Sequence, residues 1–94
     1  MAISFTDRVK VPHDVLISAL QEESVMLNLG SERYFGLNEI GTRMLTVLTS
    51  SESIEAAFEL LLEEYEVDRD VLRQDLMSLV EELVEQGLVE ISHA

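Results

Sequence analysis

Residues 24–41 read SVMLNLGSERYFGLNEIG, and this stretch decides the fold. Two apolar runs, Val25–Leu29 and Tyr34–Leu37, flank a Gly-Ser-Glu-Arg segment that is typical of a turn between antiparallel strands. Asn38, a preferred helix N-cap residue, follows the second run, and a helical pattern of apolar residues begins at once. The stretch therefore predicts a β-hairpin that leads directly into a helix.

The rest of the chain extends this hairpin in both directions. An apolar run precedes it across the polar turn 21–23, so the predicted sheet is a three-stranded antiparallel meander of Val15–Leu20, Ser24–Leu29 and Arg33–Leu37. Helical periodicity then predicts three helices, capped by Asn38, Ser53 and Asp68, the last one ending at Gly87. The predicted fold class is α+β, a three-stranded antiparallel sheet followed by three helices in one winged-helix-like domain over residues 1–94.

The two ends of the chain carry weaker patterns. Phe5, Val9 and Val11 are compatible with a short strand or a lead-in that packs on the core. Leu88, Val89 and Ile91 form an apolar tail after the last helix, which we expect to return to the core.

Composition narrows the possible functions. The net charge is −13, and residues 51–94 hold thirteen acidic side chains against two basic ones. Such a surface repels nucleic acid and anionic membranes, so we expect neither as a partner. The chain has no cysteine, no apolar run long enough to span a bilayer and no signal-peptide pattern, which indicates a cytoplasmic protein. No pattern indicates a metal or another cofactor.

The predicted third helix has two apolar stripes. Leu72, Leu76, Leu79 and Leu83 fall within a narrow arc, with Leu79 near its centre, and this arc predicts the core face. The shoulder on one side of the arc carries Arg69, Arg73, Met77, Val80 and Val84, and the opposite flank carries Asp75, Glu82 and Gln86. One interpretation is that the apolar shoulder packs against the other helices, with its two arginines in solvent near carboxylates.

The alternative interpretation is a peptide-binding groove. The shoulder would form one wall, and the free edge of the strand Arg33–Leu37, that is Arg33, Tyr34, Phe35, Gly36 and Leu37, would form the other. An extended peptide in such a groove would pair with the strand and place alternate side chains on the helix, where Arg69 and Arg73 would meet acidic residues. Alternation places Phe35 and Leu37 on the core face and Tyr34 and Gly36 on the other. Natural strand edges usually carry charge or proline, and Tyr34–Leu37 contains neither, which indicates that a partner or a helix covers it.

Four segments of the chain carry a family resemblance: residues 25–41, together with Glu-Tyr-Glu-Val-Asp at 64–68, Gln-Asp-Leu at 74–76 and Glu-Gln-Gly-Leu-Val at 85–89. In these segments the chain resembles the PqqD-like proteins, which are RiPP recognition elements. The similarity covers roughly residues 9–91 and is greatest to the stand-alone members of lasso-peptide biosynthesis. It implies a non-catalytic adaptor that binds the leader of a ribosomally made precursor peptide, adding it as a strand to the third strand against the third helix. It also implies a leader peptidase, with a macrocyclase downstream, as protein partners.

Other functions remain open at this point. A PqqD-type peptide chaperone for a different modifying enzyme would have the same fold, and a small dimerisation module would use the same strand edge for self-pairing. Catalysis is disfavoured, because the chain has no cysteine and its histidines, His13 and His93, sit near opposite ends of the sequence. A winged-helix DNA-binding protein is disfavoured by the excess of acidic side chains.

Overall fold

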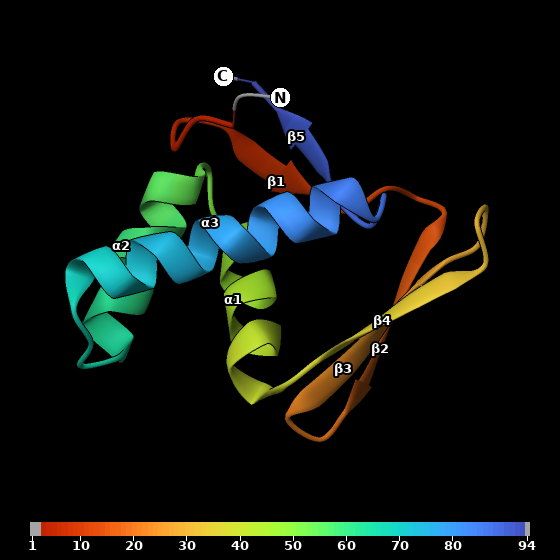
Figure 1. Cartoon of the computed structure of the whole chain (residues 1–94), viewed down its shortest axis with the longest axis horizontal. Helices are drawn as coiled ribbons and strands as arrows, with labels where there is room; N and C mark the ends of the chain where they lie inside the picture. The colour runs from red at the N-terminus through yellow and green to blue at the C-terminus, as the bar shows by residue number, and fades with distance from the viewer. Residues whose placement is uncertain (1–2, 94) are drawn as a thin grey trace.

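The computed structural model describes residues 3–93, which fold into two small sheets and three helices. Figure 1 shows how these elements are arranged. In chain order the elements are β1 (Arg8–Lys10), β2 (Val15–Leu20), β3 (Glu23–Asn28), β4 (Arg33–Leu37), α1 (Glu39–Ser50), α2 (Ile54–Glu64), α3 (Arg69–Glu85) and β5 (Glu90–Ser92). The predicted fold class is confirmed: a three-stranded antiparallel sheet is followed by three helices. None of the described helices is long and apolar enough to cross a membrane.

The larger sheet has the strand order β2-β3-β4, with β4 at its edge. Met26 lies opposite Phe35, and Ser24 lies opposite Leu37, so these four residues share one face. Met26, Ser24 and Leu37 are buried and Phe35 is half-buried, whereas Tyr34 on the other face is 76% exposed. The predicted alternation along β4 is therefore confirmed, and the face carrying Phe35 and Leu37 packs on the core.

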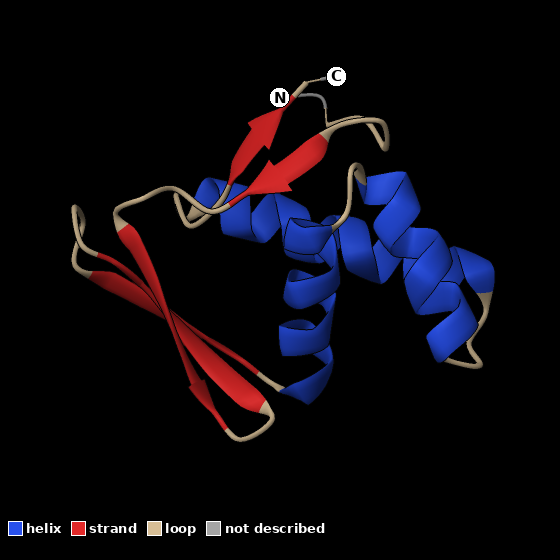
Figure 2. Cartoon of the chain, turned by 180° about the vertical axis from the view of Figure 1, so that it is seen from behind, coloured by secondary structure: helices blue, strands red, loops and turns tan. Residues whose placement is uncertain are grey.

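The two ends of the chain form a second sheet that the sequence only partly indicated. β1 and β5 pair antiparallel, with Val9 opposite Ile91, and lie side by side where both termini are marked (Figures 1 and 2). Next to them Asp7 is buried; its carboxylate accepts a hydrogen bond from the Ser4 N–H at 2.9 Å and lies 2.9 Å from His93 Nδ1. We refer to Ser4, Asp7 and His93 as the terminal clasp.

All three helices begin at the predicted caps. The side chains of Asn38, Ser53 and Asp68 accept hydrogen bonds from backbone N–H groups in the first turns of α1, α2 and α3. After α3 the chain turns at Gly87, whose φ of 72° is costly for residues with a side chain. Leu88 and Val89 then enter the core, as expected from the apolar tail.

One position of the predicted core face of α3 is wrong. The buried row is Leu72, Leu76, Val80 and Leu83, each 4% exposed or less, whereas Leu79 is only half-buried. Val80, which the sequence placed on an open shoulder, is fully buried. The buried arc of α3 is therefore rotated toward Val80, because the helix contacts neighbours on that side as well as beneath it.

This rotation can be tested with two matched valines on α3. Val80→Ala should lower the free energy of unfolding by about 2–3 kcal/mol, because it removes buried methyl groups and leaves a cavity. Val84→Ala, the same change at a half-buried position, should cost less than about 1 kcal/mol. Urea denaturation of both variants measures the difference, and equal losses would contradict the assigned rotation.

The terminal clasp should make stability depend on pH through Asp7. The hydrogen bond from the Ser4 backbone, and next the His93 side chain, hold the pKa of Asp7 below its usual value. A carboxyl whose pKa is lower in the folded state stabilises the protein above its unfolded pKa, and this contribution disappears as the pH falls through the folded pKa. Asp7→Asn should therefore be less stable than the parent at pH 7, and the difference should shrink in acid.

The measurement is urea denaturation of parent and variant across the acidic range. Glu63→Gln, a change of the same charge at an exposed site on α2, is the control and should leave the pH profile close to that of the parent. A stability gap between Asp7→Asn and parent that is constant with pH would refute the role of Asp7.

Candidate functional site

The outer edge of β4 is the first component of the candidate site. β4 pairs with β3 on one side, and no other described strand pairs with it. An edge strand leaves N–H and C=O groups unpaired along its open side. A Cβ added at Gly36 would meet no atom within 4 Å, so the face of β4 that carries Tyr34 is also open at this position. β4 therefore presents accessible backbone hydrogen-bonding groups.

The flank of α3 that faces β4 is the second component. Arg33, the first residue of β4, places its Nη1 atom 3.4 Å from Gln86 Oε1, and Asn28 Nδ2 donates to the Gly87 carbonyl at 2.9 Å. These contacts bring the C-terminal end of α3 to the start of β4. Helical spacing places on the same flank the residues Val71, Asp75, Leu79, Glu82 and Gln86, which we call the inner flank.

A small apolar cavity lies at the other end of the inner flank. It has a volume of about 100 Å³ and is lined by Ile40, Met44, Tyr65, Val67, Val71, Leu72 and Asp75. Ile40, Val67 and Val71 are each about half exposed, although they are large and apolar. We call this cavity the end pocket. Because α1 begins directly after β4, the end pocket lies near the C-terminal end of β4.

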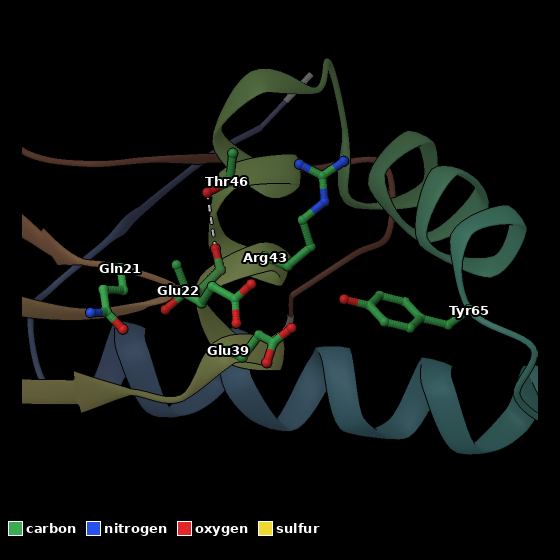
Figure 3. A pocket seen from close by; sticks show the side chains of 7 residues that line it. Gln21, Glu22, Glu39, Arg43, Thr46 and Tyr65 are labelled. Atoms are coloured by element: carbon green, nitrogen blue, oxygen red, sulfur yellow. Dashed lines mark hydrogen bonds between the residues drawn. The ribbon is translucent and has the colours of Figure 1, made fainter.

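A polar hollow of about 250 Å³ adjoins the end pocket and shares Tyr65 with it. Figure 3 shows the Glu22 and Glu39 side chains beside one another in this hollow, with Tyr65 on the other side. Arg43 also lines it, but its guanidinium is bound by Glu64, and this hydrogen bond lowers the pKa of Glu64. The hollow is therefore acidic in character.

The structure places the predicted helix wall on the flank of α3 that contacts α2 and the N-terminal segment. Arg69 is 5.0 Å from the centre of the Phe58 ring and forms an ion pair with Glu59 of α2, and Arg73 lies 3.9 Å from the centre of the Phe5 ring. Met77 and Val84 are half-buried against the core, and Val84 lines a hollow with Ile3. These four residues form an outer flank that faces α2 and the N-terminal segment instead of β4.

Val80 also cannot serve as a wall residue, because it is fully buried. Of the ten residues predicted to bind a peptide, the structure therefore brings together Arg33, Tyr34, Phe35, Gly36 and Leu37 on β4, and it places the other five elsewhere. The surfaces of β4 and the inner flank offer unpaired backbone groups, an apolar cavity and carboxylates. Among residues 3–93, no group of three or more His, Asp or Glu side chains is arranged to hold a metal ion.

Comparison with known proteins identifies the family. The family model described as coenzyme PQQ synthesis protein D (PqqD) matches residues 23–89, which is most of the chain. The chain belongs to the PqqD family. Proteins of this family are RiPP recognition elements, non-catalytic modules that bind peptides. The matched region contains β3, β4 and all three helices, so it includes every element of the candidate site.

Two solved structures resemble this PqqD-family chain closely. TbiB1 in complex with the TbiA(β) leader peptide is 30% identical with a TM-score of 0.80, and the match covers 86% of this chain and 94% of that one. Lasso peptide synthetase B1 complexed with the leader peptide is 24% identical with a TM-score of 0.79, covering 88% of this chain and 98% of that one. A search of curated protein sequences found no match.

The residues of the end pocket were missed at the sequence level. Val71 lies about 100° from Leu72 on the helix, so it falls outside the predicted core arc. An apolar residue at such a position is the signal that could have indicated an apolar surface there, and Val71 is indeed exposed. The helical spacing places Asp75, Glu82 and Gln86 on one flank but assigns them no function. The sequence could not show which flank faces β4, because that depends on tertiary contacts such as the burial of Val80 and the contact of Arg73 with Phe5.

The contact between Arg73 and Phe5 predicts a structural effect for this arginine. Arg73→Gln should lower the free energy of unfolding by about 0.5–1 kcal/mol, because it removes a cation–π contact. A double-mutant cycle with Phe5→Leu, followed by urea denaturation, measures the coupling between the two side chains. Additive losses would show that Arg73 does not stabilise the fold through Phe5.

Proposed function

We propose that this chain binds the leader segment of a ribosomally synthesised precursor peptide as an added strand on β4, with side chains on the inner flank of α3. The open edge of β4 carries the proposal, because strand addition needs a row of unpaired backbone groups beside pockets for alternate side chains. Membership of the PqqD family and the similarity to two proteins solved with leader peptides support it.

The two faces of the added strand would meet different surroundings. Side chains on one face would point toward the core side of the sheet, where Phe35 is half-buried and the end pocket is open. Side chains on the other face would continue the row that contains Tyr34 and would stay exposed. A disordered leader would be ordered on binding, at a cost of about 2–5 kcal/mol that the backbone hydrogen bonds and the apolar anchor must offset.

The proposed role continues with delivery of the bound precursor. In a lasso-peptide pathway, which the two structural relatives favour, the recipients would be a leader peptidase and then a macrocyclase. The place of action would be the cytoplasm, where ribosomes release the precursor. The runner-up is a PqqD-type chaperone that serves another modifying enzyme, and it predicts the same leader binding with a different recipient.

Amide hydrogen exchange followed by NMR tests strand addition directly. The probe is a synthetic leader from the precursor encoded next to this chain, with a scrambled peptide as control. In the free protein, alternate amides of residues 33–37 should exchange rapidly, and these should become protected when the leader binds. Saturable leader binding without new protection in β4 would refute this binding mode, and absence of binding by the folded protein would refute the proposed function.

Two exposed aliphatic residues give a matched test of the helix surface. Val71 of the inner flank and Leu60 of α2 are both 54% exposed, so replacing either should leave the fold intact. Val71→Asn should weaken leader binding about tenfold by making the end pocket polar, and Leu60→Asn should change it less than about twofold. Fluorescence anisotropy measures both, and equal effects would contradict the assignment of the inner flank.

A further inference from the structure

The charges around the end pocket indicate which peptides this chain accepts. We propose that the bound peptide is cationic: one apolar side chain enters the end pocket, and a lysine or arginine two positions away pairs with Asp75. Glu82, farther along the inner flank, favours a second basic residue. This inference rests on the proposed function and specifies its substrate class.

The cavity itself is the feature that points to a ligand. Three large apolar side chains, Ile40, Val67 and Val71, remain about half exposed around it, and Met44 and Leu72 form buried parts of its lining. Leaving this apolar surface in water is unfavourable, so an apolar side chain entering it gains free energy of transfer. Asp75 is the one charged residue of the lining, and it is exposed.

The acidic side chains of the inner flank are available to a peptide. None of the ion pairs among the described residues involves Asp75 or Glu82. Glu39 and Glu22 add negative charge in the adjoining polar hollow (Figure 3). A peptide that lies here therefore meets carboxylates on the helix side and beyond the end pocket.

The basic residues of the chain do not neutralise this surface. Arg69 and Arg73 stack on phenylalanine rings of the outer flank, and Arg43 is bound by Glu64. Arg8 and Lys10 belong to β1, so Arg33 is the basic residue that reaches the inner flank, at Gln86. An acidic peptide would be repelled both locally and by the net charge of −13, whereas a basic one would be steered in.

The spacing of the two anchors follows from backbone geometry. Val71 and Asp75 are one helical turn apart, which corresponds to about 6 Å along α3. Side chains two residues apart on an extended strand share a face and lie about 6.6 Å apart. A peptide strand that runs along α3 with one side chain beside Val71 therefore brings the side chain two positions away to the level of Asp75, at the edge of the end pocket.

Selection from a phage-displayed library of random linear peptides tests the inference without a known ligand. Three purified proteins are compared: the parent, Asp75→Asn/Glu82→Gln, and Glu81→Gln/Glu85→Gln. The last pair lies beside Val84 and Ile3, away from the inner flank, and has the same net charge as the first. Parent and control should enrich peptides with lysine or arginine two positions from an apolar residue, and the inner-flank variant should lose this preference.

Binding of one enriched peptide gives the quantitative result. The inner-flank variant should bind it about three- to tenfold more weakly than the control, the range expected for partly exposed ion pairs. Enriched peptides that are neutral or acidic would overturn the inference. If such peptides still protect the β4 amides from hydrogen exchange, the proposed function stands. Equal weakening by both variants would also overturn it, and no enrichment by the folded parent would overturn both proposals.

Discussion

α3 has to bury one row of side chains, and the candidate site depends on which row this is. Leu72, Leu76, Val80 and Leu83 are almost entirely removed from water, which stabilises the fold by about 6–12 kcal/mol in total. That amount is comparable to the whole stability of a small domain, so the helix cannot rotate about its axis. Its fixed rotation turns the inner flank toward β4 and directs Arg69 and Arg73 to the opposite side.

The parts of the fold that depend on local chemistry could be predicted from the sequence. Asn38, Ser53 and Asp68 cap helices because their side chains reach nearby N–H groups, and Gly87 allows a turn with positive φ. The edge strand β4 could be predicted because its apolar run directly follows the turn at residues 30–33. The direction in which each flank of α3 faces could not be predicted, because a helical wheel gives the angles between residues without the identity of the neighbours. The contact between Phe5 and Arg73, for example, joins residues 68 positions apart.

The two flanks of α3 differ in what their charged side chains contact. The outer flank uses its arginines on aromatic rings, while the carboxylates of the inner flank remain in solvent near an open strand edge. A family of peptide-binding modules can therefore retain one core and change what it binds by changing a few exposed residues. In the proposed binding mode the strand edge would contribute affinity through the backbone, which every peptide shares, so discrimination between peptides would fall to the helix.

The terminal clasp has a consequence for the order of folding. Asp7 and His93 are 86 residues apart in the chain, whereas the hairpins of the larger sheet join strands that nearly adjoin. Closing a loop of that length in an unfolded chain has an entropic cost of about 4 kcal/mol, which the contact must offset. Local hairpins and helices form on shorter loops, so β1 and β5 meet after the core has brought them together. We therefore expect β1 and β5 to be the last part of the domain to assemble.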